Sequence, residues 1–303
     1  MHAQIKNYKI NSIKKNIGKS KITMFSDIQY AANFKLTILN DIIKLSKESN
    51  PDYICIPGDI LDDVDVINEV EERDILIAWL KCLSNIAKVI ISIGNHDIMH
   101  QVDNKWELNM NDMWFNDVKR LSNVVLLDNS IYEDKKIRFI GFNPSFSHYE
   151  KDKEDIISFL IEINIAFNSV LSNDLYNIML CHTPTNIFKD FIIDNTPILK
   201  NIDLVLSGHI HGGLVPPIIE RLWDGNKGFI DPQLQLFPEI ARGLIRTNGM
   251  TGIISTGITK LGPSTGLLAK MNCLYPMNIN NIEIGEDFKD LESNNICKKK
   301  YLK

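Results

Sequence analysis

The sequence contains few cysteines, and none of them are clustered. There are five, far apart and without a CxxC pair: Cys55, Cys82, Cys181, Cys273 and Cys297. An odd number of scattered cysteines indicates a reducing compartment. Cys55 and Cys181 fall inside apolar runs, where cysteine behaves as a small hydrophobic residue. We therefore expect both to be packed within strands.

Long hydrophobic runs are also missing. No stretch approaches the roughly 18 apolar residues of a membrane span, and the start, "MHAQIKNYKINSIKK", lacks the apolar region of a signal peptide. We therefore expect a cytoplasmic protein. The lysines of this start and of the final "CKKKYLK" are expected to form solvated surface. Peripheral attraction to an anionic membrane face is the alternative.

There is no excess of positive charge either. With 33 Lys and Arg against 38 Asp and Glu, the net charge is −5. Neutralising phosphates requires a basic surface, so the balance argues against a nucleic-acid partner. The 303 residues show no repeat or linker. We expect one domain over residues 1–285, with a polar, basic tail over 286–303.

Short apolar runs alternate with helical spacing along the chain. The runs end at turn residues, as strands buried on both faces do; they are "KITMF", "DYICIP", "KVIISIG", "KIRFIGF", "NIMLCH" and "DLVLSG". Residues 34–49, 66–86 and 150–170 show helical spacing between them. The region around Trp106 and Trp114 is also expected to be helical. This order predicts an α/β fold with a largely parallel sheet and crossover helices.

Polar residues follow nearly all of these strands. The segments are "SDIQ" (Asp27, Gln29), "GDILD" (Asp59, Asp62), "GNHD" (Asn95, His96, Asp97), "CHTP" (His182) and "GHIH" (His209, His211). A lone Asp after a strand usually caps a helix or stabilises a turn, and a lone His is usually a core residue. Chance explains the joint pattern poorly, because only three histidines, at positions 2, 100 and 148, lie outside it. Since ligands collect beyond the carboxyl ends of strands, the five segments are expected to converge.

The chemistry of two close metal ions suits this mixture of residues. A metal pair clamps the attacking and leaving oxygens of a phosphoryl displacement, and two close dications need a bridging carboxylate, for which Asp59 is the natural candidate. Imidazoles with carboxylate and amide oxygens suit Mn, Fe or Zn better than Mg or Ca. We expect glycines beside the ligands, such as Gly58 and Gly94, to let the backbone pack close to metal and phosphate.

The ordered motifs resemble those of the calcineurin-like metallophosphoesterase superfamily, from Asp27 to His211. The start "IKNYKINS", the segment "SGHIHGG" and the later "IISTGI" resemble its bacterial YkuE/YaeI-like phosphodiesterase branch. The resemblance implies a four-layer α/β/β/α sandwich with two mixed β-sheets flanked by helices. It also implies a phosphoric ester hydrolase, phosphodiesterase or phosphatase, with two divalent metal ions.

The resemblance assigns roles position by position. Asp27, Gln29 and His211 would hold the first metal, and Asp59 would bridge to the second. Asn95, His182 and His209 would complete the set of ligands around the second metal. His96 would stabilise the transition state or protonate the leaving oxygen, while Asp62 and Asp97 would orient groups such as His96. A hydroxide bridging the metals would attack phosphorus in line.

Gln29 departs from the family pattern, in which His is commonest at this place. An amide oxygen is a harder donor than imidazole, so the first site should bind more weakly or prefer Mn. A second feature is the long stretch 212–249, which we expect to form a lid or specificity insertion. Its apolar residues are expected to pack in a small subdomain, or else to form a rim that touches lipid. Arg221, Arg242 and Arg246 are candidates for a second phosphate contact, although surface arginines are usually just that. His148 follows a strand and is expected to be exposed to solvent, with entry into the pocket as the alternative.

The favoured substrate is a small or lipid-linked phosphate ester, with a phosphodiester preferred. Two alternatives stay open at this point. One is a nuclease of the same superfamily, against which the acidic balance weighs. The other is a non-catalytic metal-binding scaffold with the same fold, against which His96 and the three metal histidines weigh.

Overall fold

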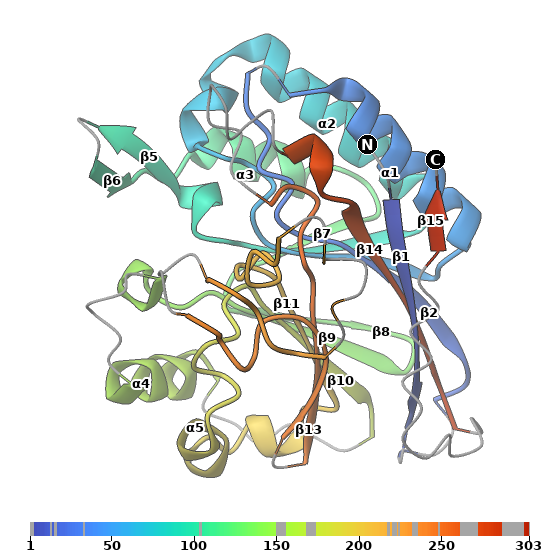
Figure 1. The fold of residues 1–303 in the computed structure, drawn as a ribbon, viewed down its shortest axis with the longest axis vertical. Coiled ribbons are helices and arrows are strands. Elements are labelled where there is room, and N and C mark those ends of the chain that lie inside the picture. The colour runs from blue at the N-terminus through green and yellow to red at the C-terminus, as the bar shows by residue number, and fades with distance from the viewer. Residues whose placement is uncertain are drawn as a thin grey trace.

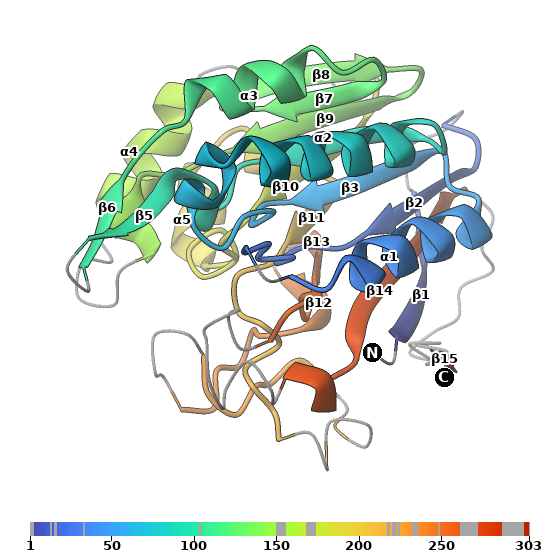
Figure 2. The same cartoon turned by 90° about the horizontal axis from the view of Figure 1, so that it is seen from above.

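Two β-sheets form the centre of the protein. The computed structural model describes residues 3–12, 14, 17–32, 34–102, 105–149, 156–167, 174–216, 219, 223, 225–231, 236–247, 249–260, 272–286 and 300–302. The first sheet has the order β15-β1-β14-β2-β3-β4-β7 and the second β12-β13-β11-β10-β9-β8. A separate two-stranded ribbon, β5 (Met99–Val102) with β6 (Lys105–Leu108), projects from the body (Figure 2).

The first sheet is mixed. Its strands are β1 (Ala3–Asn11), β2 (Ser20–Met24), β3 (Tyr53–Pro57), β4 (Lys88–Ser92), β7 (Val124–Leu127), β14 (Met277–Gly285) and β15 (Lys300–Leu302). Neighbours run parallel except at β14 with β2 and at β1 with β15. The late strand β14 thus lies between the two earliest strands, which the alternating sequence pattern did not predict.

The second sheet is also mixed. Its strands are β8 (Ser130–Asp134), β9 (Ile137–Phe142), β10 (Tyr176–Cys181), β11 (Leu204–Ser207), β12 (Gly243–Thr247) and β13 (Met250–Ile254). The strands from β9 to β13 in the sheet order pair in parallel, while β8 and β12 pair antiparallel to their neighbours. All six predicted apolar runs are strands of these two sheets.

Helices cover the outer face of each sheet. On the first sheet lie α1 (Leu36–Ser49), α2 (Val70–Ser84) and α3 (Asp112–Lys119); on the second lie α4 (Ile156–Ala166) and α5 (Asp190–Asn195) (Figures 1 and 2). Short 3₁₀ turns are η1 (Val64–Asn68), η2 (His96–Ile98), η3 (Phe146–Tyr149), η4 (Leu199–Asn201) and η5 (Asn272–Leu274). The predicted four-layer sandwich is confirmed.

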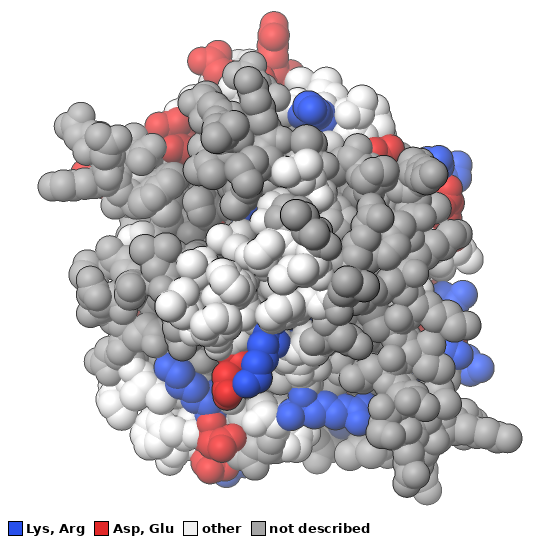
Figure 3. Space-filling view, viewed as in Figure 1, with Lys and Arg blue, Asp and Glu red and all other residues white. Residues whose placement is uncertain are grey.

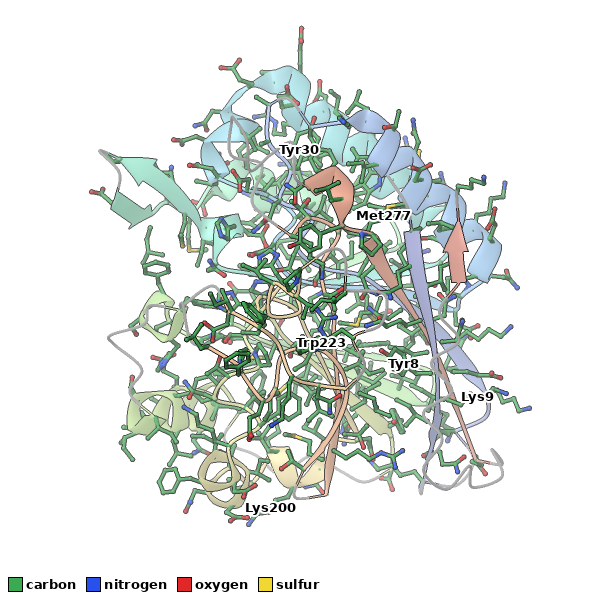
Figure 4. The ribbon with its side chains drawn as sticks, in the orientation of Figure 1. Tyr8, Lys9, Tyr30, Lys200, Trp223 and Met277 are labelled. Atoms are coloured by element: carbon green, nitrogen blue, oxygen red, sulfur yellow. The ribbon has the colours of Figure 1, made fainter. Side chains whose placement is uncertain are left out.

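The side chains of each strand point alternately to its two faces, and together they form three apolar layers. In β3, Ile54 and Ile56 pack under α1 and α2, while Tyr53 and Cys55 face the second sheet. Figure 4 shows the same alternation in β1, where Tyr8 points towards the second sheet and its neighbour Lys9 points away. Strands with both faces covered read as continuous apolar runs, which is why the sequence located them. The cysteines at positions 55 and 181 are fully buried, as expected.

Four predictions are compared with the structure at the level of elements. The stretch 66–86 divides into η1 and α2, and of the stretch 150–170 only residues 156–167 are described. Trp114 packs in α3 as predicted, but Trp106 lies in strand β6 and not in a helix. Of the predicted tail, residues 287–299 and 303 lie outside the described residues, while residues 300–302 pair with β1. The helices of the described part include none that is long and apolar enough to cross a membrane.

Candidate metal centre

The predicted ligands follow strands of both sheets. The ligand segments are residues 26–29 after β2, 58–59 after β3, 94–97 after β4, 182 after β10 and 208–211 after β11. Backbone hydrogen bonds join these segments: Asp27 N–H donates to Gly58 O at 3.3 Å, and Gly208 N–H donates to His182 O at 3.0 Å. His209 N–H donates to Asp27 Oδ1 at 2.9 Å, which connects the two sheets. The strand ends therefore converge as predicted.

Most of the ligands occupy a strained backbone conformation. Five have a positive φ that non-glycine residues seldom adopt; they are Asp27 (52°), Gln29 (49°), Asp59 (56°), His209 (67°) and His211 (48°). Each such residue costs of order 1–3 kcal/mol and persists only where its surroundings determine it. This strain points to a functional site, because the loops turn sharply in order to aim these side chains inwards.

Two glycines make the close approach of the loops feasible. A Cβ atom at Gly94 would lie 2.2 Å from Asp59 Oδ1, and one at Gly58 would lie 2.6 Å from His182 Nδ1. Gly58 also has a φ of 84°, which suits glycine. Any larger residue at Gly94 would therefore displace the carboxylate predicted to bridge the metals.

One group of ligands, here called the second-metal group, consists of Asp59, Asn95, His182 and His209. One side-chain atom each from Asp59, His182 and His209 lies within 4.8 Å of the others, and all three residues are buried. His182 Nδ1 donates to Pro57 O at 2.7 Å, which leaves Nε2 as a metal donor 2.9 Å from Asp59 Oδ2. Asn95 is placed beside them, since the next residue donates its N–H to Asp59 Oδ1 at 3.0 Å.

The other group, the first-metal group, consists of Asp27, Gln29 and His211. His211 Nε2 lies 3.7 Å from Asp27 Oδ1 and 3.3 Å from Gln29 Nε2. His211 Nδ1 donates to Thr259 O at 2.8 Å, so Nε2 is the nitrogen available to a metal. Asp27 also lies 3.8 Å from His182 Nε2, which brings the two groups into contact.

Buried nitrogen and oxygen atoms without hydrogen-bond partners show that these groups could hold metal ions. Among the described residues, hydrogen-bond partners are missing for Gln29 Oε1, Asp59 Oδ2, Asn95 Oδ1, His182 Nε2 and His209 Nε2. Asp59 Oδ2 and His182 Nε2 approach each other, but their contact lacks hydrogen-bond geometry. Leaving one buried polar atom unsatisfied costs about 1–3 kcal/mol. Five at one place form a donor set of nitrogen and oxygen that fits divalent transition metals.

In the metal-free centre, neighbouring carboxylates and imidazoles shift each other's pKa. Burial alone would raise the pKa of Asp59, but His182 and His96 hold it below its usual range. Burial alone would lower the pKa of His182, yet the Asp59 carboxylate raises it to about 9. Burial holds the pKa of His209 well below its ordinary value. Burial also lowers the pKa of His211 below its ordinary value. The latter two imidazoles are therefore neutral and ready to act as ligands.

The three predicted catalytic residues have different contacts. His96, partly exposed, donates from Nδ1 to the backbone carbonyl of Asp62 at 2.6 Å, so Asp62 contacts His96 through its main chain. Burial raises the pKa of the Asp62 carboxyl to about 7, although His96 opposes the shift. The Asp97 carboxylate instead accepts backbone N–H bonds from residues 59, 60, 61 and 94 at 2.8–3.0 Å. It shapes the loop that carries Asp59.

One further expectation was wrong, and one candidate phosphate contact has a structural partner. His148 is fully buried and contacts Glu162 at 3.1 Å, so it is not a solvent-exposed side chain. Arg242 is also buried, and its guanidinium donates to Gly212 O at 2.8 Å, which fixes the loop after His211. Arg246 is exposed on β12, and Arg221 lies outside the described residues.

Sequence reasoning missed three residues at the centre. The ring of Tyr149 lies 5.0 Å from that of His209. Thr259 accepts from His211, and the buried Lys260 ammonium donates to His211 O at 3.0 Å. Thr259 and Lys260 follow β13, and Tyr149 follows β9, the same strand-end signal that located the ligands.

Comparison with known proteins finds two relatives that are described as metallophosphoesterases. The chain is 24% identical over 205 residues to a putative metallophosphoesterase of Caenorhabditis elegans, covering 67% of this chain and 39% of the relative. It is 24% identical over 223 residues to an uncharacterized metallophosphoesterase of Campylobacter jejuni, covering 69% and 48%. The chain thus spans less than half the length of either relative.

Solved structures match at lower similarity. A dimetal phosphatase from Danio rerio is 12% identical, with 80% of this chain and 89% of that chain covered and a TM-score of 0.44. The Plasmodium protein GAP50, described as the anchor in the inner membrane complex, is 12% identical, with 82% and 75% covered and a TM-score of 0.40. The family model for calcineurin-like phosphoesterases matches residues 20–213, which is more than half of the chain and includes every predicted ligand. The chain therefore belongs to the calcineurin-like phosphoesterase family.

Proposed function

We propose that this protein hydrolyses a phosphate ester, preferably a phosphodiester, with two divalent metal ions. The supporting observation is the set of five buried donor atoms without hydrogen-bond partners among the described residues. A scaffold that bound no metal would leave these groups unsatisfied in the core at a considerable cost in stability. The first-metal and second-metal groups would hold one ion each, with Asp59 between them.

The metal ions, when bound, would supply Lewis-acid activation of a water molecule and of a phosphate oxygen. The protein supplies the positions. His182 and His211 have Nδ1–H bonds to backbone carbonyl oxygens, so their Nε2 atoms are fixed as donors. The left-handed loops and the Asp97 bonds hold Asp59 in place before a substrate arrives.

His96 is the residue proposed to act on the substrate. Its Nδ1–H donates to Asp62 O, which fixes the orientation of the ring. From there it can stabilise the charge that develops on phosphorus or donate a proton to the leaving oxygen. We propose Mn as the favoured metal, with Fe or Zn as alternatives, because Gln29 contributes a hard amide oxygen.

The substrate is proposed to be a small or lipid-linked ester. Phe229, Leu236 and Phe237 are 37%, 60% and 56% exposed, and Phe229 N–H donates to Gly213 O two residues after His211. An apolar group so close to a metal ligand supports an amphiphilic substrate or peripheral membrane contact. On the face shown in Figure 3, the described Lys and Arg side chains are interspersed with acidic ones and form no continuous stripe, which does not favour a nuclease. We also propose the YkuE/YaeI-like branch and a cytoplasmic location.

The test is hydrolysis of bis-p-nitrophenyl phosphate by metal-stripped protein with Mn added back. Wild type is compared with Asn95→Ala, His96→Ala and the control His100→Ala, a histidine outside the centre that contacts Asp65. We expect a Mn-dependent rate that falls by about 10²–10⁴ in His96→Ala, falls strongly in Asn95→Ala, and is unchanged in the control. Absence of a Mn-dependent rate for this diester and for p-nitrophenyl phosphate would contradict the proposal.

A further inference from the structure

The three metal histidines are oriented in two different ways. His182 and His211 each donate from Nδ1 to a backbone carbonyl, at 2.7 and 2.8 Å. Metal-ligating histidines almost always have such a bond on the nitrogen that does not bind the metal, because it fixes the ring. The ring of His209 has no hydrogen bond to a described residue, and its Nε2 is buried. Something else must fix this ring.

Aromatic contacts surround the His209 ring instead. Tyr149 meets it edge to face, with centroids 5.0 Å apart and an interplanar angle of 78°, and the His182 ring lies 5.3 Å away at 65°. Tyr149 also lies 6.1 Å from the His182 ring. It is only 7% exposed. The tyrosine therefore covers the side of the second-metal group formed by the two imidazoles.

Tyr149 is placed by a rigid platform. It ends η3, which is bonded to α4 through Glu162: the carboxylate accepts from Ser145 N–H at 2.7 Å and contacts His148 Nε2 at 3.1 Å. The His148 ring packs edge to face on Phe159 of α4, with centroids 5.2 Å apart. Burial alone would raise the pKa of Glu162, but the bonds from Ser145 and His148 lower it. The ionised carboxylate thus fastens η3 to a buried helix face.

We propose that Tyr149 is a positioning residue that holds the His209 ring for metal binding through an edge-to-face contact, in place of the usual hydrogen bond. The inference rests on the proposed function only in that the second-metal group binds a metal. An edge-to-face pair of rings is favourable beyond the area that it buries, because the positive edge of one ring meets the negative face of the other. Without it, the ring can rotate out of position, and the metal must supply the cost of ordering it.

The experiment measures Mn binding by calorimetry to metal-stripped wild type, Tyr149→Leu and Tyr149→Phe. We expect two binding events in wild type. Tyr149→Leu should weaken one event at least tenfold, in the range found for residues that orient metal ligands, and leave the other unchanged. Tyr149→Phe, which keeps the ring edge, should stay within about threefold of wild type.

The matched control is Tyr53→Leu. Tyr53 is 2% exposed and pairs with Phe139 at 4.9 Å, so the substitution removes an equally buried aromatic pair between the sheets. It should lower the Tm and leave both Mn affinities unchanged. Equal losses of affinity in Tyr53→Leu and Tyr149→Leu would overturn the proposal, as would an equal loss in Tyr149→Phe, which would assign the role to the hydroxyl.

A double-mutant cycle tests whether Tyr149 acts through His209. In a His209→Ala background, adding Tyr149→Leu should cause no further loss of Mn affinity, because the ring that it positions is gone. A full additional tenfold loss would overturn the proposal. Wild-type protein that binds no Mn would instead contradict the proposed function itself, so the two failures are distinguishable.

Discussion

At the scale of single residues, backbone conformation decides which side chains can serve the metal centre. Asp27, Asp59 and His211 follow strands, yet a positive φ turns each of them away from the path that the strand would take. The left-handed conformation costs free energy in the isolated loop. It is maintained by contacts between loops, such as the bond from His209 N–H to Asp27 Oδ1. The centre is thus preorganised without metal.

A substitution at Gly94 tests this preorganisation. Because the new Cβ in Gly94→Ala would lie 2.2 Å from Asp59 Oδ1 and 2.5 Å from Asp59 N, the carboxylate must move. We expect Mn affinity to fall at least tenfold and activity to be lost. The control Gly249→Ala has a φ of 79° with nothing within 4 Å of the new Cβ, so it should cost about 1 kcal/mol of stability and leave Mn binding intact. If Gly94→Ala binds Mn as tightly as wild type, the close approach of Gly94 to the Asp59 carboxylate does not matter for metal binding, and the prediction is wrong.

Gln29 offers an amide oxygen at a place where the resemblance leads us to expect a histidine. We predict that Gln29→His tightens the first binding event and shifts metal preference from Mn towards Zn, because imidazole is a softer donor than an amide oxygen. Gln29→Ala should weaken the same event. Competitive binding of Mn and Zn, followed by calorimetry, measures both changes. If Gln29→Ala leaves the affinities for Mn and for Zn unchanged, the amide is not a ligand.

At the scale of elements, one carboxylate connects the segments after β3 and β4. Asp97 in η2 accepts N–H bonds from residues 59, 60 and 61 and from Gly94. Asp97→Asn would turn an NH₂ group towards two of these donors. We expect a loss of about 2–3 kcal/mol of stability, together with weaker Mn binding. Urea unfolding measures the first and calorimetry the second; Asp65→Asn, at an exposed position, is the control.

The same scale shows what the sequence could predict. Five short motifs could be located because each comes directly after a strand. These strands are buried on both faces, so the sequence shows them as unbroken apolar runs. Tyr149, Thr259 and Lys260 were not predicted, since each acts through long-range contacts and belongs to no motif. The insertion of β14 between β1 and β2 was missed for a similar reason, because pairing over more than 250 residues leaves no local signal.

At the scale of the whole molecule, the two sheets bring unlike charges together at the metal centre. The first sheet contributes the carboxylates Asp27 and Asp59, and the second contributes His182, His209 and His211. Without metal, Asp59 and His182 attract each other across these sets, with Oδ2 and Nε2 2.9 Å apart. Metal ions would replace it with stronger bonds to both sheets, so metal and pH should affect stability together.

The metal-free protein should therefore lose stability as the pH rises. The pKa of His182 is about 9 in the folded protein, raised above the ordinary value of 6.5 by Asp59. A group whose folded pKa is raised stabilises the fold fully below pH 6.5 and loses this contribution as the pH rises through about 9.

With Mn bound, the trend should reverse, because His182 must release its proton before Nε2 can act as a ligand, and affinity then grows with pH. Urea midpoints at pH 6.5, 8 and 9.5, with EDTA or with excess Mn, measure both trends. In His182→Gln, which cannot carry the charge, the fall in the EDTA series should vanish; a fall of the same size in this variant would assign the effect to another group.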